Sequence, residues 1–385
     1  MDNGWYGAHS LKGIYNLYDF AEDPQLHKLA KNFLHLYYAA WAQEQINGVR
    51  GGGKSRIYPQ WYQSGNSQIR EFMWFYLGIG NQPDLWAERA TVATSDYRLP
   101  LVVMDLALDI EGRGEYEVRN RALGLNKPGY EYRYGDHRLR SDFGGRLRYA
   151  AVTPDFIMGM PMLEARHLDD WTLIAVLRER MGVIFRGGVS DQIMPINEGA
   201  AFNAQWGVQR KGTMIIQALP KPYAKKNGDM RVWLGGNGLQ NGVERDGWLF
   251  VETKGAYAAV RPVRGSYKLQ NGVNKLPDSW MDIDDNTSPV ILEVARKTRF
   301  DDYKAFQDAV LELSQTWDGK TLHYKGLYGD EFAFDTGYEN LPKINGEPID
   351  LAPDRVYDSP FVKSEWNSGV VAISKGDREL VLEFD

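Results

Sequence analysis

The sequence contains no cysteine, which excludes disulfide bonds, thiolate metal sites and a cysteine nucleophile. It has no run of about eighteen apolar residues, so no membrane span is expected. Histidine is scarce, and no H-E-x-x-H or similar spacing occurs, which argues against zinc. The net charge of −6 argues against general nucleic-acid binding. The opening residues, MDNGWYGAHSLKG, also lack the basic-then-apolar layout of a signal peptide.

The amino-acid composition is typical of a soluble globular protein with a large core. Hydrophobic residues make up 43% of the 385 residues and charged residues 25%. The length favours more than one domain. Aromatic residues are abundant, with 12 Trp and 22 Tyr. Most aromatic side chains pack in cores, but an excess can also line surfaces on which sugars stack.

The first hundred residues predict helices, because apolar residues recur at i, i+3, i+4 and i+7. Pro24 follows the break at Glu22-Asp23 and is placed to begin the second helix. The predicted helices cover residues 9–21, 24–45 and 66–77, with shorter ones near 83–90 and 100–110.

The stretch GVRGGGKS, residues 48–55, satisfies the phosphate-loop pattern G-x-x-x-x-G-K-[ST]. That loop needs a strand before it and a helix after it. Here a predicted helix precedes the pattern, and RIYPQWYQSGNS, with Pro59, follows it. We therefore interpret the stretch as a glycine-rich helix C-cap and turn, without a nucleotide site.

From about Tyr116 onward the pattern changes to strands separated by Gly, Asn and Asp turns. Examples are GTMIIQAL, MRVWLGG, GWLFVETKGAYAAVRPV and GVVAISKGDRELVLEF. One helix, near 301–314, interrupts them. The sequence predicts a multidomain α+β protein: a helical domain, residues 1–112, then an antiparallel β-sandwich-like region, residues 113–385.

Two clusters could carry chemistry. The first two helices are joined by a short break and should run antiparallel, which brings the start of the first and the end of the second to one end of the pair. The side chains expected at this mouth are Tyr6, His9, Arg50, Arg56, Tyr58, Trp61 and Asn66.

The second cluster is YEYRYGDHRLRSDFGGRLRY, residues 130–149. SDFGG predicts a hairpin turn, and alternation places two pairs of arginines on strand faces. Facing like charges destabilise a hairpin, and an anionic ligand would relieve this repulsion. The alternative is a solvated edge, where arginines discourage strand addition. The candidate binding residues are Tyr134, His137, Arg138, Arg140, Arg146 and Arg148.

The order of the two regions resembles the polysaccharide lyases in which an (α/α) toroid precedes antiparallel β-sheets, the heparinase II/III-like and alginate-lyase-like group. The resemblance is based on four sequence segments: LYDFAEDPQLHKLAKNFLHLYYAAWA, GVRGGGKSRIY, GAYAAVRP and SPVILEVARK. It implies a toroid that is incomplete or shortened here, since few helices are predicted. It further implies cleavage of an acidic, uronate-containing polysaccharide by β-elimination, in the periplasm or outside the cell.

Such a reaction requires a group that neutralises the uronate carboxylate, a base, and an acid for the leaving oxygen. Arg56 and Asn66 are the candidates for neutralisation. Tyr58 and either His9 or His137 are the candidates for proton transfer.

Two other functions stay open. A glycoside hydrolase needs two carboxylates across the scissile bond, and the candidates are Asp136, Asp142, Asp155, Asp191 and Glu198. A non-catalytic glycan-binding protein would use the aromatic residues alone.

No cofactor is expected, and calcium is the alternative. Positions one, three, five and twelve of a calcium-loop template are filled by Asp282, Asp284, Asn286 and Glu293. Thr287, however, takes the place of the template glycine, and PVILEV predicts a strand where a helix is required.

Overall fold

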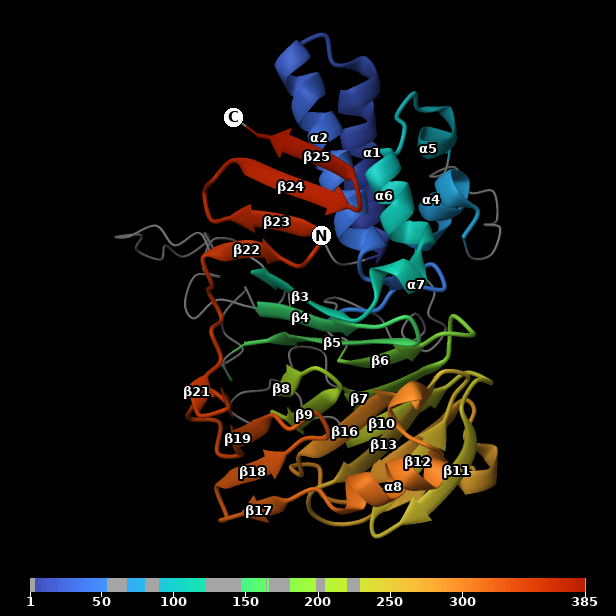
Figure 1. Ribbon diagram of the computed structural model, residues 1–385, viewed down its shortest axis with the longest axis vertical. Coiled ribbons are helices and arrows are strands. Elements are labelled where there is room, and N and C mark those ends of the chain that lie inside the picture. The colour runs from blue at the N-terminus through green and yellow to red at the C-terminus, as the bar shows by residue number, and fades with distance from the viewer. Residues whose placement is uncertain are drawn as a thin grey trace.

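The computed structural model describes residues 4–53, 68–79, 90–121, 147–163, 165, 181–198, 205–219 and 229–384. The N-terminal helices lie at one end of the molecule beside the C-terminal strands, and antiparallel sheets with one further helix make up the rest (Figure 1). The chain is therefore an α+β protein in which helices precede the sheets, as the sequence predicted. The described part of the chain shows no complete toroid.

The helices form where the periodicity predicted them. Asp23 accepts a hydrogen bond from the backbone N–H of Gln25, and Pro24 occupies the first turn, so both residues define where the second helix begins. The predicted helix near 83–90 lies almost entirely outside the described residues. The helices are α1 (Gly4–Phe20), α2 (Pro24–Ala42), α4 (Gln68–Leu77), α5 (Ala90–Thr94), α6 (Leu101–Leu108) and α7 (Ile110–Arg113).

The second helix ends earlier than predicted, and the segment after it is a small hairpin. β1 (Gln45–Ile46) pairs with β2 (Val49–Arg50). Asn47 and Gly48 between them both have positive φ, 55° and 77°. Asn-Gly is the preferred pair for such a two-residue turn. The interpretation of Gly48 as part of a helix C-cap was therefore wrong.

The three glycines after the hairpin pack flat against β5 (Phe156–Met162). A Cβ on Gly51 would lie 2.5 Å from Cβ of Ile157, and one on Gly53 would lie 2.4 Å from the backbone carbon of Met160. Such distances leave no room for a side chain. Close approach to a strand explains these glycines, whereas Lys54 and Ser55 of the phosphate pattern lie outside the described residues.

Gly53→Ala is expected to destabilise the protein by about 1–3 kcal/mol, because the added methyl group meets backbone atoms that cannot move aside. Gly13→Ala in α1 is the matched control, since nothing lies within 4 Å of its added Cβ. That variant should gain roughly 0.5–1 kcal/mol from lower chain entropy. Urea unfolding of both variants measures the difference, and equal effects would contradict the packing described.

The largest sheet has 12 strands, all antiparallel, in the order β14-β15-β10-β7-β6-β5-β4-β3-β22-β23-β24-β25. Its last four strands come from the C-terminal end of the chain and join it where Tyr357 pairs with Asn120. Besides β5, its strands are β3 (Tyr116–Arg121), β4 (Leu147–Val152), β6 (Gly182–Phe185), β7 (Gln192–Glu198), β10 (Asp229–Gly235), β14 (Tyr267–Leu269), β15 (Ser279–Ile283), β22 (Arg355–Asp358), β23 (Val362–Glu365), β24 (Val370–Lys375) and β25 (Arg378–Glu383).

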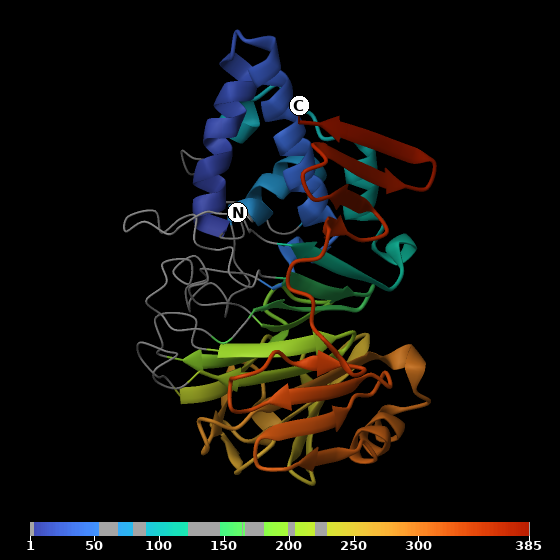
Figure 2. The same cartoon turned by 90° about the vertical axis from the view of Figure 1, so that its left-hand side faces the viewer.

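Two smaller antiparallel sheets lie at the end opposite the helices (Figure 2). The six-stranded sheet contains β11 (Gln240–Arg245), β12 (Trp248–Glu252), β13 (Ala256–Pro262), β16 (Val290–Arg296), β9 (Thr213–Ala218) and β8 (Gln205–Arg210). The five-stranded sheet contains β17 (Gln315–Trp317), β18 (Thr321–Lys325), β19 (Glu331–Asp335), β20 (Lys343–Ile344) and β21 (Glu347–Pro348). Between them in the chain lies α8 (Tyr303–Leu311), which confirms the helix predicted near 301–314.

The main hydrophobic core is shared by all three of these sheets. It includes Met158 of β5, Ile215 of β9 and Phe334 of β19. A second core joins the helices to the C-terminal strands, with Tyr38 of α2 and Ile373 of β24 among its members. The helical layer is thus attached to the large sheet through strands that come from the other end of the chain.

Candidate functional site

Most of the predicted site residues lie outside the described residues. These are Arg56, Tyr58, Trp61, Asn66, Tyr134, His137, Arg138, Arg140 and Arg146, together with the side chain of Tyr6. Three predicted residues are described: His9, Arg50 and Arg148.

Arg50 and Arg148, predicted in two separate clusters, meet at one carboxylate. The Nε of Arg50 donates to Oε2 of Glu44 at 2.7 Å. A terminal guanidinium nitrogen of Arg148 lies 3.4 Å from the same oxygen. Glu44 follows the end of α2 and is 2% exposed. The structure therefore joins the two clusters at a residue that the sequence analysis did not name.

The backbone also links the two clusters. The Nε of Arg148 donates to the carbonyl oxygen of Gly53 at 3.1 Å. Asn120, which faces Arg148 across β3 and β4, donates to the second oxygen of Glu44 at 3.1 Å. Gly53 is the last described residue before the segment that carries Tyr58, and Arg148 lies in the described end of the arginine-rich segment. The described ends of both segments are thus in contact.

The position of Glu44 is fixed by contacts at the end of α2. Arg113 donates to the carbonyl oxygens of Ala42 and Gln45, the latter at 2.8 Å. The hydroxyl of Tyr116 donates to the carbonyl oxygen of Gln43. Helix C-termini leave such carbonyls without partners, and a cation there is favourable. Burial lowers the pKa of Arg113 and raises that of Tyr116.

Several buried polar atoms close to Glu44 make no hydrogen bond within the described residues. They are Nε2 of Gln43, Nε of Arg113 and Oδ1 of Asn120. Leaving a buried polar atom unpaired costs about 1–3 kcal/mol. In proteins, buried polar atoms of this kind are usually satisfied by ordered water or another polar group.

His9 lies toward the start of α1, where its Nδ1 is 3.4 Å from the ammonium group of Lys12. α1 and α2 pack as an antiparallel pair (Figure 2). The part of α1 that carries His9 and the end of α2 that leads to Glu44 consequently lie at the same end of the pair, as the sequence predicted.

A cluster of tyrosines among the helices was not predicted from the sequence. The hydroxyl of Tyr15 is 2.5 Å from that of Tyr38 and 2.6 Å from that of Tyr76. The Nδ1 of His35 is 2.8 Å from the hydroxyl of Tyr97. Burial raises the pKa of Tyr76 to about 12 and lowers that of His35 to about 4. These groups are poor proton-transfer partners near neutral pH, so we interpret the cluster as a hydrogen-bonded core.

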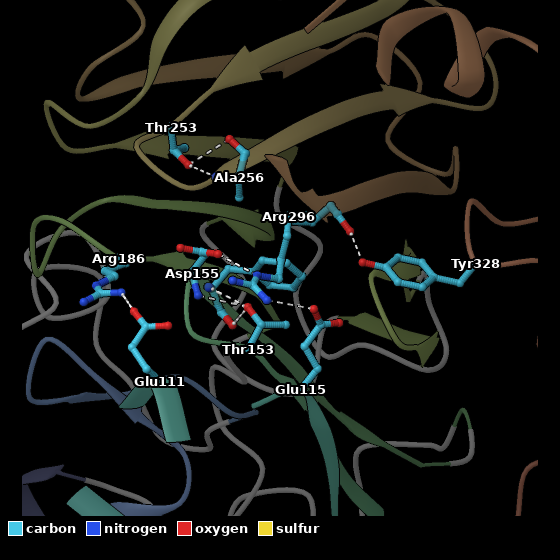
Figure 3. A network of polar contacts seen from close by, with 11 residues as sticks. Glu111, Glu115, Thr153, Asp155, Arg186, Thr253, Ala256, Arg296 and Tyr328 are labelled. Carbon is cyan, nitrogen blue, oxygen red and sulfur yellow. Dashed lines mark hydrogen bonds and ion pairs between the residues drawn. The ribbon is translucent and has the colours of Figure 1, made fainter. Parts of the chain in front are cut away.

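The carboxylates proposed for a hydrolase have structural partners. The Nε of Arg296 donates to Asp155 at 2.6 Å, and its Nη1 donates to Glu115 at 3.0 Å (Figure 3). Burial would lower the pKa of Arg296, but these two hydrogen bonds outweigh it and raise the pKa. The hydrolase candidate Asp155 thus shares the guanidinium group of Arg296 with Glu115. The arrangement connects the 12-stranded and six-stranded sheets.

The side chain of Asp191 also has structural hydrogen-bond partners. Its side chain accepts from the backbone N–H of Gly188 at 2.6 Å and of Gly238 at 3.0 Å, and the residue is 5% exposed. It therefore fastens two loops together. The other hydrolase candidates, Asp136 and Asp142 and the side chain of Glu198, lie outside the described residues.

The residues of the calcium-loop template have separate partners. Asp282 pairs with Arg231 at 2.6 Å, and Asp284 accepts from the hydroxyl of Ser266 at 2.7 Å. Glu293 lies in β16, where it accepts from Thr213. The described residues hold no group of three or more possible metal ligands.

The fold and this site define an α+β protein with a buried arginine–glutamate cluster, Glu44, Arg50 and Arg148, where the helices meet the large sheet. No helix in the described ranges is long and apolar enough to cross a membrane. Comparison with protein-family models, with curated proteins and with solved structures finds no match to this chain.

Proposed function

We propose that the protein is a carbohydrate-active enzyme, a polysaccharide lyase that cleaves an acidic, uronate-containing polysaccharide by β-elimination. In this proposal the helices belong to an incomplete or shortened (α/α) toroid. The observation that carries the proposal is the meeting of Arg50 and Arg148 at Glu44, because it joins the two segments that hold the predicted catalytic and anion-binding residues.

The proposal assigns different tasks to the two clusters. Arg56 and Asn66 neutralise the uronate carboxylate, which makes the neighbouring proton more acidic. Tyr58, with His9 or His137, removes that proton and protonates the leaving oxygen. The arginine-rich segment that ends at Arg148 binds further uronates along the chain, since guanidinium groups match carboxylates in geometry as well as charge.

Glu44 has a positioning role in this scheme. It holds the Arg50 and Arg148 guanidinium groups from one side, and Asn120 and the end of α2 hold Glu44 itself. A preorganised set of donors costs no rearrangement when substrate binds, which is the condition for efficient charge stabilisation.

The test is a panel of polysaccharides: alginate, glucuronan, ulvan, heparinoids and pectins, with neutral glucans as controls. Ultraviolet absorbance and new reducing ends are followed together. We expect both signals to rise on one acidic polymer, because elimination creates a conjugated double bond. Reducing ends without absorbance would indicate a hydrolase. Glycan binding without either signal would indicate a non-catalytic binding protein, and both results would contradict the proposal.

A further inference from the structure

The five-stranded sheet is fastened to the six-stranded sheet by the turn between β18 and β19, residues 326–330. A Cβ on Gly326 would lie 2.3 Å from the hydroxyl of Thr213 in β9, so the turn packs as closely as glycine allows. The hydroxyl of Tyr328 donates to the carbonyl oxygen of Val294 in β16 at 3.1 Å (Figure 3). The turn therefore adds specific polar contacts to the hydrophobic core that the two sheets share.

A fully buried carboxyl group lies at the centre of this contact. Glu293 of β16 is 0% exposed and stands opposite Thr213 in the strand register. Its Oε2 accepts from the hydroxyl of Thr213 at 2.9 Å, and the backbone N–H of Leu327 lies 3.4 Å from both of its oxygens. One donor thus comes from the sheet and the other from the turn.

The titratable and charged groups around Glu293 come from every strand packed against it. Tyr324 of β18 faces the carboxyl group, and Arg261 of β13 lowers the pKa of Tyr324 against the larger rise caused by burial. Arg299 stacks on the ring of Tyr328, with its guanidinium carbon 4.3 Å from the ring centre. Within the described residues none of these cations forms an ion pair with Glu293.

Lys211, which precedes β9, already has an acidic partner. The ammonium group of Lys211 lies 3.0 Å from Asp330 at the end of the turn. A carboxylate buried without a cation is costly, so such a group retains its proton. Burial accordingly raises the pKa of Glu293 to about 8, although hydrogen bonds from Thr213, Tyr324 and Leu327 oppose the rise.

We propose that Glu293 is a pH-sensitive latch at the contact between the two sheets: its neutral form holds the 326–330 turn in place, and its ionised form releases the turn. The latch is independent of the enzymatic activity proposed above. It makes attachment of the five-stranded sheet weaker in alkaline solution.

The direction of the pH effect on stability follows from proton binding by Glu293 in the folded and unfolded states. Between about pH 4.5 and about pH 8 the folded protein keeps a proton on Glu293 that the unfolded chain has lost. The stabilisation that protonated Glu293 contributes is fully present below about pH 4.5. It is lost as the pH rises to about 8. A neutral glutamine at position 293 does not titrate, so it should remove this dependence.

The experiment compares the wild-type protein with Glu293→Gln and with the control Glu331→Gln. Glu331 begins β19, and its exposed carboxylate lies 3.9 Å from the ammonium group of Lys325. We expect the unfolding midpoint of the wild-type protein and of the control to fall by several degrees from about pH 6 to about pH 9. The Glu293→Gln profile should be flatter. Parallel profiles for all three proteins would overturn the proposal.

Two measurements on the wild-type protein keep the test decisive if Glu293→Gln does not fold. Infrared spectroscopy should show a protonated carboxyl group at neutral pH that disappears near pH 8. Hydrogen exchange, corrected for its intrinsic pH dependence, should show that β18 and β19 lose protection before β12 and β13. An infrared spectrum without that band at neutral pH, or equal loss in both sheets, would contradict the latch.

Discussion

Glu44→Gln is expected to lower the free energy of unfolding by about 3–5 kcal/mol, because it removes one partner from a buried ion pair. The side chain of Glu44 is 3% exposed and those of Arg50 and Arg148 are 12% and 9% exposed. Glutamine has the same length and nearly the same shape as glutamate, but it leaves both guanidinium groups without this counter-charge. Urea unfolding monitored by circular dichroism measures the loss.

The control is Glu383→Gln, which removes an exposed ion pair with Lys28 at 3.4 Å. Both partners are at least half exposed, so this change should cost at most about 1 kcal/mol. If Glu44→Gln were as mild as Glu383→Gln, the buried cluster would not hold the helices and the large sheet together as described.

Tyr58→Phe and Arg56→Ala are expected to abolish measurable turnover of the cleaved polysaccharide while the fold stays intact. Loss of a positioned proton-transfer group typically lowers a rate by about 10²–10⁴-fold. Loss of a group that stabilises developing negative charge has an effect of about 10²–10³-fold. Initial rates of absorbance change measure both, and an unchanged unfolding midpoint shows that the fold is retained.

Two results would show that this assignment is wrong. Full activity of both variants would remove Tyr58 and Arg56 from the reaction. If Tyr58→Phe lowered turnover only mildly and substitution of one carboxylate abolished it, the result would favour a glycoside hydrolase. Because Glu44→Gln acts through stability and positioning, its activity loss should partly recover at low temperature, whereas that of Tyr58→Phe should not.

The helices and many of the strands could be predicted because their signals are local. The apolar repeat of α2 and the Asp23-Pro24 start are readable within a few residues. The hairpin at Asn47-Gly48 also has a local signal, an Asn-Gly pair between short apolar strands. It was missed because the glycines that follow it were given more weight than the Asn-Gly pair.

The site could not be predicted in the same way, since its contacts join residues far apart in the chain. Arg148 lies in β4, which pairs with β5, and the glycines of residues 51–53 pack against β5. Arg148 reaches Gly53 only because of these two contacts. The pairing of Asn120 with Tyr357 likewise places C-terminal strands under the helices. Register across such distances is set by the packing of whole faces, which a single sequence pattern does not encode.

The most direct test of the central proposal is the mass of the products formed from the cleaved polysaccharide in ¹⁸O-labelled water. Elimination consumes no water, so we predict unlabelled products that carry one double bond. Hydrolysis adds one oxygen from solvent to each new reducing end. Labelled, saturated products would contradict the lyase and would direct attention to the carboxylates instead of Tyr58 and Arg56.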